Sequence, residues 1–295
     1  MQLTRKQFDI LTLLKRIEAS LSQRDIAAKT NMAVGSVNNT MAQLKDFNYI
    51  LSDKITDQGM LALEPYRVQR AVFIAAGLGA RLIPITLNTP KPLVRVKGVR
   101  IIDTMLDAVV DAGIKEIVIV RGYLSEQFDQ LLYKYPNIKF LENPLYNETN
   151  NISSAMCARH LFKNAYIFDG DLIFYNKALV TPYQYCSNYV GVPVKVTDNW
   201  CLESKNGVIT RMRRGGENCH VMFGFSYWTE SDGVKLAEHI KRVYETPGGK
   251  ERFWDQVPLE CFAAEYQVQI RQCSFDDITE IDTYNDLKRL DRAYA

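Results

Sequence analysis

The segment from Ala71 to Pro92 places the strongest constraint on what this chain can fold into. It opens with an apolar run, Ala71 to Ile74, that predicts a buried strand. The run leads into Gly77 and Gly79, a G-x-G spacing that lets the backbone turn sharply and approach a ligand closely. Backbone N–H groups in such a turn form an anion-binding hollow. The segment therefore predicts a strand followed by a phosphate-binding loop.

Two basic side chains follow these glycines and add fixed positive charge. Arg81 comes directly after the turn, and Lys91 stands between two prolines that stiffen its position. The third glycine of the dinucleotide fingerprint is missing, because position 82 is Leu82, and no Gly-Lys-Ser/Thr sequence makes a P-loop. We expect a loop that holds a polyphosphate with backbone donors and two cations. The alternative is an ordinary strand–turn–helix with both basic side chains solvated.

Composition places the chain among globular proteins. Its 295 residues allow one large core and a small domain, with 47% hydrophobic and 24% charged residues. The net charge of +2 argues neither for nor against nucleic acid. No apolar run approaches the ~20 residues of a membrane span, and the first residues lack an apolar signal core, so we expect a cytoplasmic protein with no membrane partner. The six cysteines form no C-x-x-C pair, which argues against a zinc site and a disulfide framework.

Residues 1–68 follow a different pattern from the rest of the chain. Thr4, Ser22 and Ser36 are suited to cap three successive helices, and two short strands are expected between residues 50 and 56. This order resembles a winged helix-turn-helix domain, and the end of its wing is similar to that of MarR-type bacterial regulators. We therefore expect a separate N-terminal domain.

The third helix of this domain would read DNA if the domain binds it. We expect five polar side chains on its outer face, where amides and hydroxyls can hydrogen-bond base edges or phosphates. Residues 1–70 hold ten Lys/Arg against seven Asp/Glu, an excess of +3, whereas DNA binding usually brings a stronger basic patch. A role in dimerisation or packing stays open beside DNA binding. The five side chains are Ser36, Asn38, Asn39, Thr40 and Gln43.

Residues 69–295 alternate between strand and helix patterns. Apolar runs at 116–120 and 165–168 predict further strands. This alternation predicts an α/β domain with a mostly parallel sheet, helices on both faces and ligands at the carboxyl ends of the strands. The glycine loop, then Gly122 and Tyr123 after the first of these strands, and an acidic segment after the second all fall at that edge.

Two pairs of acids alternate along the sequence. Asp169 and Asp171 follow a predicted strand, and Glu280 and Asp282 lie near the C-terminus. Residues at i and i+2 of an extended segment point to one face, so each pair can face a common pocket. Mg²⁺ takes carboxylate oxygens together with phosphate oxygens. A solvated turn with two aspartates is the alternative for the first pair.

All three tryptophans, Trp200, Trp228 and Trp254, lie in the second half of the chain. Aromatic faces beside a carboxylate bind quaternary ammonium groups through cation–π attraction, and Asp198 and Asp255 could supply the negative charge. The alternative for each tryptophan is a place in the core or in a pocket wall.

Taken together, these motifs resemble a known family. Their order is Ile-Ala-Ala-Gly-Leu-Gly-Ala-Arg-Leu, Thr-Pro-Lys-Pro-Leu, Arg-Gly-Tyr-Leu-Ser-Glu-Gln-Phe, Tyr-Asn-Glu-Thr-Asn-Asn-Ile-Ser-Ser, Asn-Trp, Phe-Trp-Asp and Glu-Ile-Asp-Thr. The string resembles the nucleotidyltransferases that join an NTP to a phosphorylated sugar or alcohol, and over residues 70–292 it looks like the bacterial CTP:phosphocholine cytidylyltransferases. Ala80 stands where that family commonly has serine or threonine, which removes one hydroxyl contact to phosphate.

The resemblance implies a Rossmann-like, GT-A-like fold and a Mg²⁺-dependent reaction of CTP with phosphocholine that yields CDP-choline and pyrophosphate. It implies three catalytic residues, Lys91, Arg81 and Asp171, and a magnesium site of Asp171, Asp282 and, less directly, Glu280, with Asp169 behind them. The nucleotide would contact Ala75, Ala76, Gly77, Gly79, Arg81, Gly122, Tyr123, Asn151 and Ser154. The headgroup would contact Trp200, Trp228, Phe253, Trp254 and Asp255.

Two other functions stay open at this point. One is a sugar-1-phosphate nucleotidyltransferase that uses UTP or dTTP, because such enzymes share the glycine loop and the Pro-Lys-Pro. The other is a transcriptional regulator whose transferase-like domain only senses a ligand. Whether the chain forms a homodimer, and whether residues 1–68 contact DNA, are likewise open.

Overall fold

The computed structural model describes residues 2–17 and 21–295 of the chain. Its packing divides the chain into two compact units, which are described separately. The smaller unit comprises Met1–Arg67 with Tyr183–Tyr185, and the larger one comprises Val68–Pro182 with Cys186–Ala295. The smaller unit thus includes three residues from the middle of the sequence.

The smaller unit is a winged helix-turn-helix. Thr4 and Ser22 cap the first two helices as predicted, each accepting a hydrogen bond from the backbone N–H three residues on. The predicted cap at Ser36 is wrong, because the left-handed Asn31 already ends the second helix and the third begins at Val34. The elements are α1 (Arg5–Arg16), α2 (Gln23–Thr30), α3 (Val34–Asp46), β1 (Ile50–Leu51), β2 (Lys54–Ile55) and α4 (Asp57–Leu63).

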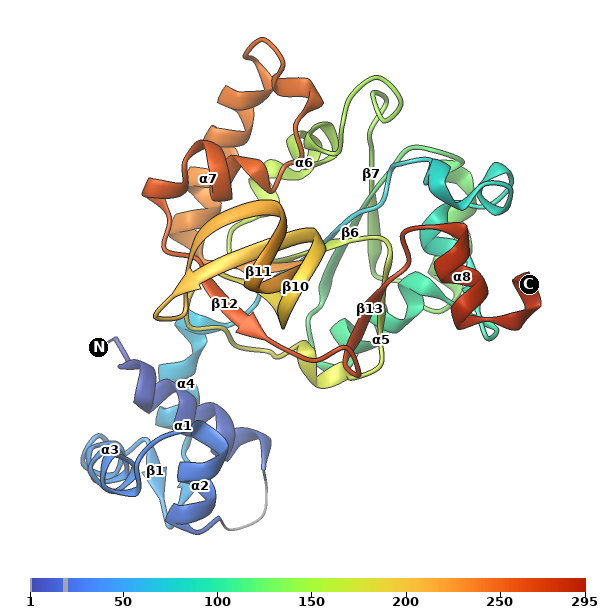
Figure 1. Ribbon diagram of the computed structural model, residues 1–295. Helices are drawn as coiled ribbons and strands as arrows, with labels where there is room; N and C mark the ends of the chain where they lie inside the picture. Colours follow the sequence, from blue (N-terminus) through green and yellow to red (C-terminus); the bar gives the residue numbers. More distant parts are fainter. Residues whose placement is uncertain (1, 18–20) are drawn as a thin grey trace. The chain divides into compact units, whose positions relative to one another are not determined.

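A seven-stranded sheet forms the centre of the larger unit, in the order β10-β12-β11-β8-β3-β6-β7 (Figure 1). Strand β3 pairs in parallel with β6 and β8, and β6 pairs in parallel with β7, so these four strands end at one edge. The predicted mostly parallel α/β fold is confirmed. The strands are β3 (Arg70–Ile74), β6 (Glu116–Arg121), β7 (Ile138–Glu142), β8 (Ala165–Asp169), β10 (Asn188–Lys205), β11 (Val208–Trp228) and β12 (Gln269–Gln272).

Helices cover both faces of this sheet, as Figure 1 shows. Phe73 and Phe168 belong to the apolar core under α5, whereas Val72 and Ile167 belong to the core under α6 and α7. The two cores separate because successive side chains of β3 and β8 point to opposite faces. No helix in the described ranges has both the length and the apolar character needed to cross a membrane. The helices are α5 (Ile101–Asp111), α6 (Ile152–Ala158), α7 (Glu230–Tyr244) and α8 (Tyr284–Leu290).

Two small antiparallel pairs complete the larger unit. One joins β4 (Arg95–Val96) to β5 (Val99–Arg100), and the other joins β9 (Leu172–Phe174) to β13 (Ile278–Glu280). Just beyond the second pair, the N–H of Ile281 donates to the carbonyl of Asp171 at 3.0 Å. This pairing holds the C-terminal acids beside the turn that follows β8.

Candidate active site

The glycine loop leaves the carboxyl end of β3. Ala75 donates its N–H to β6 at 2.9 Å, and Ala75 and Ala76 are buried while Gly77 is exposed. Gly79 has a φ of 69°, in the left-handed region, and a Cβ there would lie 2.9 Å from Cβ of Lys91. Glycine is therefore required at this position by the backbone and by the close approach of Lys91.

Lys91 is a buried cation that faces two acids. Its Nζ is 2.8 Å from Oδ2 of Asp171 and 3.8 Å from Oδ1 of Asp282, and Arg81 pairs with the other oxygen of Asp282. Burial alone would lower the pKa of Lys91, but the charges of Asp171, Glu280 and Asp282 together raise it. The ammonium group therefore stays protonated. The partners lie far apart in the sequence: 80 positions separate Lys91 from Asp171, and 201 separate Arg81 from Asp282.

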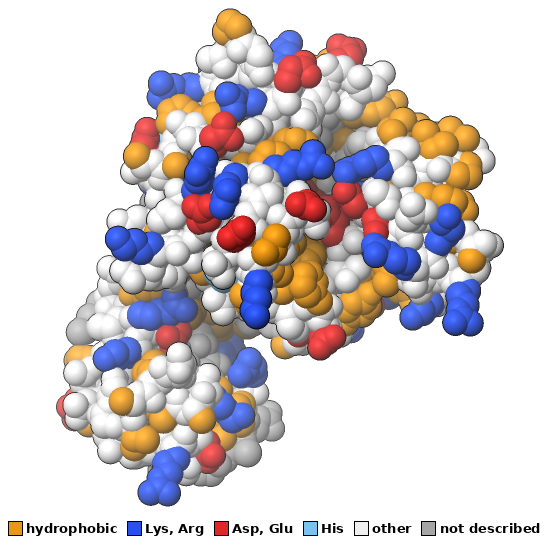
Figure 2. Space-filling model, viewed as in Figure 1, with side chains coloured by type: hydrophobic (Ala, Val, Ile, Leu, Met, Phe, Trp, Pro, Cys, Tyr) orange, Lys and Arg blue, Asp and Glu red, His pale blue; other side chains and the backbone are white. Residues whose placement is uncertain are grey.

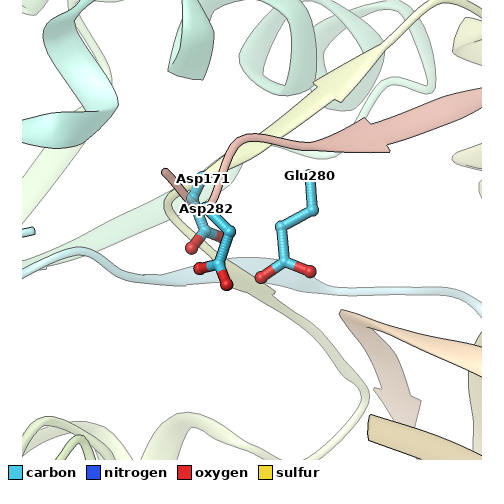
Figure 3. Close-up of side chains that lie close together, drawn as sticks. All are labelled: Asp171, Glu280 and Asp282. Carbon is cyan, nitrogen blue, oxygen red and sulfur yellow. The ribbon is translucent and has the colours of Figure 1, made fainter. Parts of the chain in front are cut away.

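Three carboxyl groups gather beside this network. Oxygens of Asp171, Glu280 and Asp282 lie within 4.8 Å of one another, and Figure 3 shows the three groups directed to the same side. Oδ1 of Asp171 and Oδ1 of Asp282 are buried and accept no hydrogen bond from residues 2–17 or 21–295. On the face shown in Figure 2, acidic side chains gather in a hollow of the larger unit, with basic side chains along its rim. Carboxylate oxygens at this spacing, two of them without donors, fit a hard divalent cation such as Mg²⁺.

Asp169 stands outside this cluster. Burial raises the pKa of Asp169 most, and the negative charge of Asp255 raises it further. Tyr189 donates a hydrogen bond to Asp255, and burial raises the pKa of Asp255 to about 7. Gly224 leaves room for this arrangement, because a Cβ there would lie 2.0 Å from Oδ2 of Asp169. The site thus contains a second acidic pair, Asp169 with Asp255. The sequence predicted Asp169 behind the metal ligands and Asp255 beside the headgroup, but not that the two act on each other.

The aromatic residues predicted to hold the headgroup divide into buried and exposed ones. Trp228 is fully buried and donates its Nε1–H to Ser226, so it is a core residue and the predicted substrate contact is wrong. Trp254 is 1% exposed and stacks on Tyr189 with ring centroids 6.3 Å apart. Trp200 and Phe253 meet edge to face at 6.0 Å, and Phe253 is 40% exposed. This last pair is the part of the aromatic group that is open to a ligand. The exposed Asp198 lies two residues before Trp200.

The turn at Asn150 and Asn151 holds the Trp254 segment in place. Oδ1 of Asn151 accepts the N–H of Trp254 at 2.9 Å, and the Asn150 side chain donates to the backbone of the same segment at 3.1 Å. Ser154 is 3% exposed and accepts a hydrogen bond from Asn143. Its hydroxyl thus packs α6 against the preceding loop, and its contact with the nucleotide stays a prediction.

Gly122 and Tyr123 follow β6 at the same edge of the sheet. The N–H of Tyr123 donates to Ala76 at 2.9 Å, and its hydroxyl donates to the carbonyl of Leu87 at 2.9 Å. A Cβ on Gly122 would lie 2.7 Å from the ring of Tyr146. Hydrogen bonds thus join Tyr123 to Ala76, just before the two glycines, and to Leu87, after them. The contact of this segment with a nucleobase stays a prediction.

The structure also brings in residues that the sequence reasoning missed. Gly224 interrupts an apolar strand, a pattern that signals a close backbone approach and could have pointed to the site. Tyr189 carries no local signal, because its importance arises only from the contact with Asp255, 66 residues away.

In the smaller unit, α3 presents amides on its outer face. Asn38, Asn39 and Gln43 are exposed, and Ser36 is partly exposed. The predicted outward position of Thr40 is wrong, because Thr40 is 5% exposed and its hydroxyl donates to a backbone carbonyl one turn earlier.

Comparisons with known proteins agree with this geometry. The family described as "Nucleotidyl transferase" matches residues 70–210, and the one described as "Winged helix-turn-helix DNA-binding" matches residues 3–50. The fold and the clustered cations and acids thus define a nucleotidyltransferase class of enzyme.

Individual relatives narrow this class. A 2-aminoethylphosphonate cytidylyltransferase of Lancefieldella rimae is 35% identical over 229 residues, which cover 76% of this chain and 93% of the relative. A choline-phosphate cytidylyltransferase of Haemophilus influenzae is 30% identical over 219 residues, which cover 73% and 93%. The solved structure of the CTP:phosphocholine cytidylyltransferase from Streptococcus pneumoniae has a TM-score of 0.71 and 28% identity, covering 78% of this chain and 100% of that one. The chain belongs to the nucleotidyl transferase family, as a cytidylyltransferase with an N-terminal winged helix-turn-helix.

Proposed function

We propose that this enzyme transfers a cytidylyl group from CTP to the phosphate or phosphonate of a small molecule with a cationic nitrogen headgroup. Phosphocholine, expected from the sequence, and 2-aminoethylphosphonate, named for one relative, both belong to this class. The observation that carries the proposal is the convergence of Lys91, Arg81 and the three clustered carboxylates at the carboxyl edge of the sheet.

The reaction needs no protein nucleophile. An oxygen of the acceptor phosphate or phosphonate attacks the α-phosphorus of CTP, the bond to the bridging oxygen of the β-phosphate breaks, and pyrophosphate leaves. Catalysis is then positioning and stabilisation of negative charge. The buried Lys91 would neutralise charge at the α-phosphate, while Arg81, whose side chain is 67% exposed, would hold the outgoing phosphates with the backbone of Gly77 and Gly79.

Asp171, Glu280 and Asp282 would hold the Mg²⁺ ion. Such an ion, when bound, supplies Lewis-acid stabilisation of phosphate oxygens. Without nucleotide, Lys91 and Arg81 pair with Asp171 and Asp282. Phosphate groups would attract both cations, which would leave the carboxylates free to hold the metal.

The neighbouring side chains support a cationic headgroup rather than a sugar. Asp169 and Asp255 place two carboxyls beside the transfer centre, and Trp200 and Phe253 add exposed aromatic surface. Carboxylates and aromatic faces complement positive charge. A neutral sugar would instead leave both carboxyls without a counter-charge.

A pyrophosphate-release assay tests the proposal. The full chain with Mg²⁺ is offered each of four NTPs with phosphocholine, 2-aminoethylphosphonate or glucose 1-phosphate. We expect release with CTP and the nitrogen-bearing acceptors. Release only with the sugar phosphate and UTP or dTTP would replace the proposal with the sugar enzyme. A folded protein that releases no pyrophosphate from any pair would support the ligand-sensing regulator instead.

We also propose that the smaller unit binds duplex DNA through α3. The exposed amides of Asn38, Asn39 and Gln43, and the family match over residues 3–50, support this role. To test this role, the full chain is used to select bound sequences from a pool of random DNA duplexes, and fluorescence anisotropy then measures its affinity for the selected duplexes. We expect the double variant Asn38→Ala, Asn39→Ala to lose sequence preference while pyrophosphate release is unchanged. If the full chain binds no DNA duplex even at low salt, a role of the smaller unit in dimerisation would be favoured instead.

A further inference from the structure

The acidic pair of Asp169 and Asp255 lies in a buried setting. Asp255 is 5% exposed, and its hydrogen-bond partner Tyr189 is fully buried. Within the described residues, neither carboxyl forms an ion pair with a lysine or an arginine. Lys91 and Arg81, the cations of the transfer centre, are paired with Asp171 and Asp282. Two carboxyl groups without a counter-charge are costly to bury, so this pair is suited to a positive ligand.

One buried oxygen of the pair lacks a donor. Oδ1 of Asp169 is buried and accepts no hydrogen bond from the described part of the chain. The indole N–H of Trp254, on a side chain that is 1% exposed, is directed at the Asp169 carboxyl and lowers its pKa, against the larger effects of burial and of the neighbouring acids. Buried polar atoms are almost always satisfied in a folded protein, so the unpaired Oδ1 of Asp169 points to a ligand that donates to it.

The aromatic ring next to the pair is buried among other rings. Trp254 stacks on Tyr189 at 6.3 Å and contacts Phe162 and Trp228 edge to face at 5.8 and 6.3 Å. A quaternary ammonium is held mainly by aromatic faces, and Trp254, at 1% exposed, has no open face to offer. The carboxyl groups of Asp169 and Asp255 instead offer hydrogen-bond acceptors.

From this geometry we infer that Asp169 and Asp255 accept hydrogen bonds from a substrate ammonium that carries N–H groups, so that the enzyme prefers a primary over a quaternary ammonium. The inference rests on the proposed function and specifies its headgroup. A primary ammonium brings three donors to the two carboxyls, whereas a trimethylammonium brings none and leaves Oδ1 of Asp169 unpaired. Asp169 lies two residues before Asp171, at most about 7 Å along the backbone, which suits a short spacer between nitrogen and phosphorus.

A methylation series on the unaltered enzyme tests the inference without any variant. Phosphoethanolamine and its N-methyl, N,N-dimethyl and N,N,N-trimethyl forms, the last being phosphocholine, share one phosphate and one spacer. We expect kcat/KM with CTP to fall along the series, by at least about tenfold from the primary to the quaternary member. A flat or rising series with clear turnover would overturn the inference and leave the proposed function standing. No turnover with any member would overturn both.

An isosteric variant locates the effect. Asp255→Asn keeps the shape and removes the charge, so we expect it to raise KM for phosphoethanolamine at least about tenfold. The ratio between the primary and quaternary acceptors should shrink toward one, while KM for CTP stays unchanged. Glu217→Gln, which removes the same charge from an exposed position on β11, is the matched control and should alter neither KM. An unchanged ratio in a folded Asp255→Asn protein would overturn the assignment, and equal losses for CTP and for every acceptor would show a merely structural role.

Discussion

Replacing Gly79 with alanine tests how the glycine loop and Lys91 depend on each other. At a φ of 69° an alanine is strained by about 1–2 kcal/mol. Its Cβ would also lie 2.9 Å from Cβ and 3.2 Å from Cδ of Lys91. Ordinary carbon contacts begin near 3.5 Å, so Lys91 or the loop must move by roughly 0.6 Å or more. The contact adds about 1–3 kcal/mol, which gives about 2–5 kcal/mol in all.

The same movement displaces the ammonium of Lys91, which is 2.8 Å from Asp171. Misplacing a catalytic group by about 1 Å can reduce turnover about 10²-fold, so kcat/KM for pyrophosphate release should fall by about that factor. Gly113→Ala is the matched control, because Gly113 has a φ of 73° and nothing within 4 Å of its added Cβ. Urea unfolding should show about 1–2 kcal/mol lost in the control, with normal kcat/KM. If Gly79→Ala turned over as fast as Gly113→Ala, the proposed coupling of loop and lysine would be refuted.

Three further results are expected. Lys91→Met should lower kcat at least about 10²-fold, because it removes the buried cation from the phosphates; near-normal kcat in a pyrophosphate-release assay would contradict this. Asn151→Ala should raise KM for the acceptor but not for CTP, because Trp254 loses its 2.9 Å hydrogen bond, and equal KM changes for both would assign Asn151 to the nucleotide instead. Burial raises the pKa of Asp255, which faces Tyr189 and Asp169, to about 7. Ionisation strengthens ammonium binding, so KM for phosphoethanolamine should fall as the pH rises from about 6 to about 8. Asp255→Asn should remove most of that slope, since it leaves only the ionisation of the substrate phosphate.

The carboxyl edge of the sheet could be predicted because each of its segments carries a local signal. Two glycines after an apolar run mark the loop, and Lys91 between two prolines marks its second cation. Parallel pairing then brings these segments together at one edge. The ion pairs of Lys91 and Arg81 follow from that topology, although their partners are far apart in the sequence.

The headgroup side could not be predicted in the same way, because it depends on the long hairpin of β10 and β11. Trp200 and Trp228 have the same chemistry, yet one is partly exposed and the other lies in the core. What separates them is the pairing of β11 with β8, which places Trp228 opposite Ala165 inside the sheet. Register across such a hairpin is a tertiary property that no single segment encodes.

One turn explains how two aspartates separated by a single glycine belong to two different acid groups. Alternation of side chains holds only while a strand continues, and β8 ends at Asp169. Gly170 donates its N–H to Ile74 at 3.1 Å, and a Cβ there would lie 2.8 Å from Cγ of Pro92, so the chain crosses the glycine loop in close contact. Asp169 keeps the direction of the strand and faces Asp255, while Asp171 turns toward Lys91. The backbone contact at Gly170 therefore fixes the separation between the headgroup acids and the phosphate-transfer centre, and with it the length of acceptor that can bridge them.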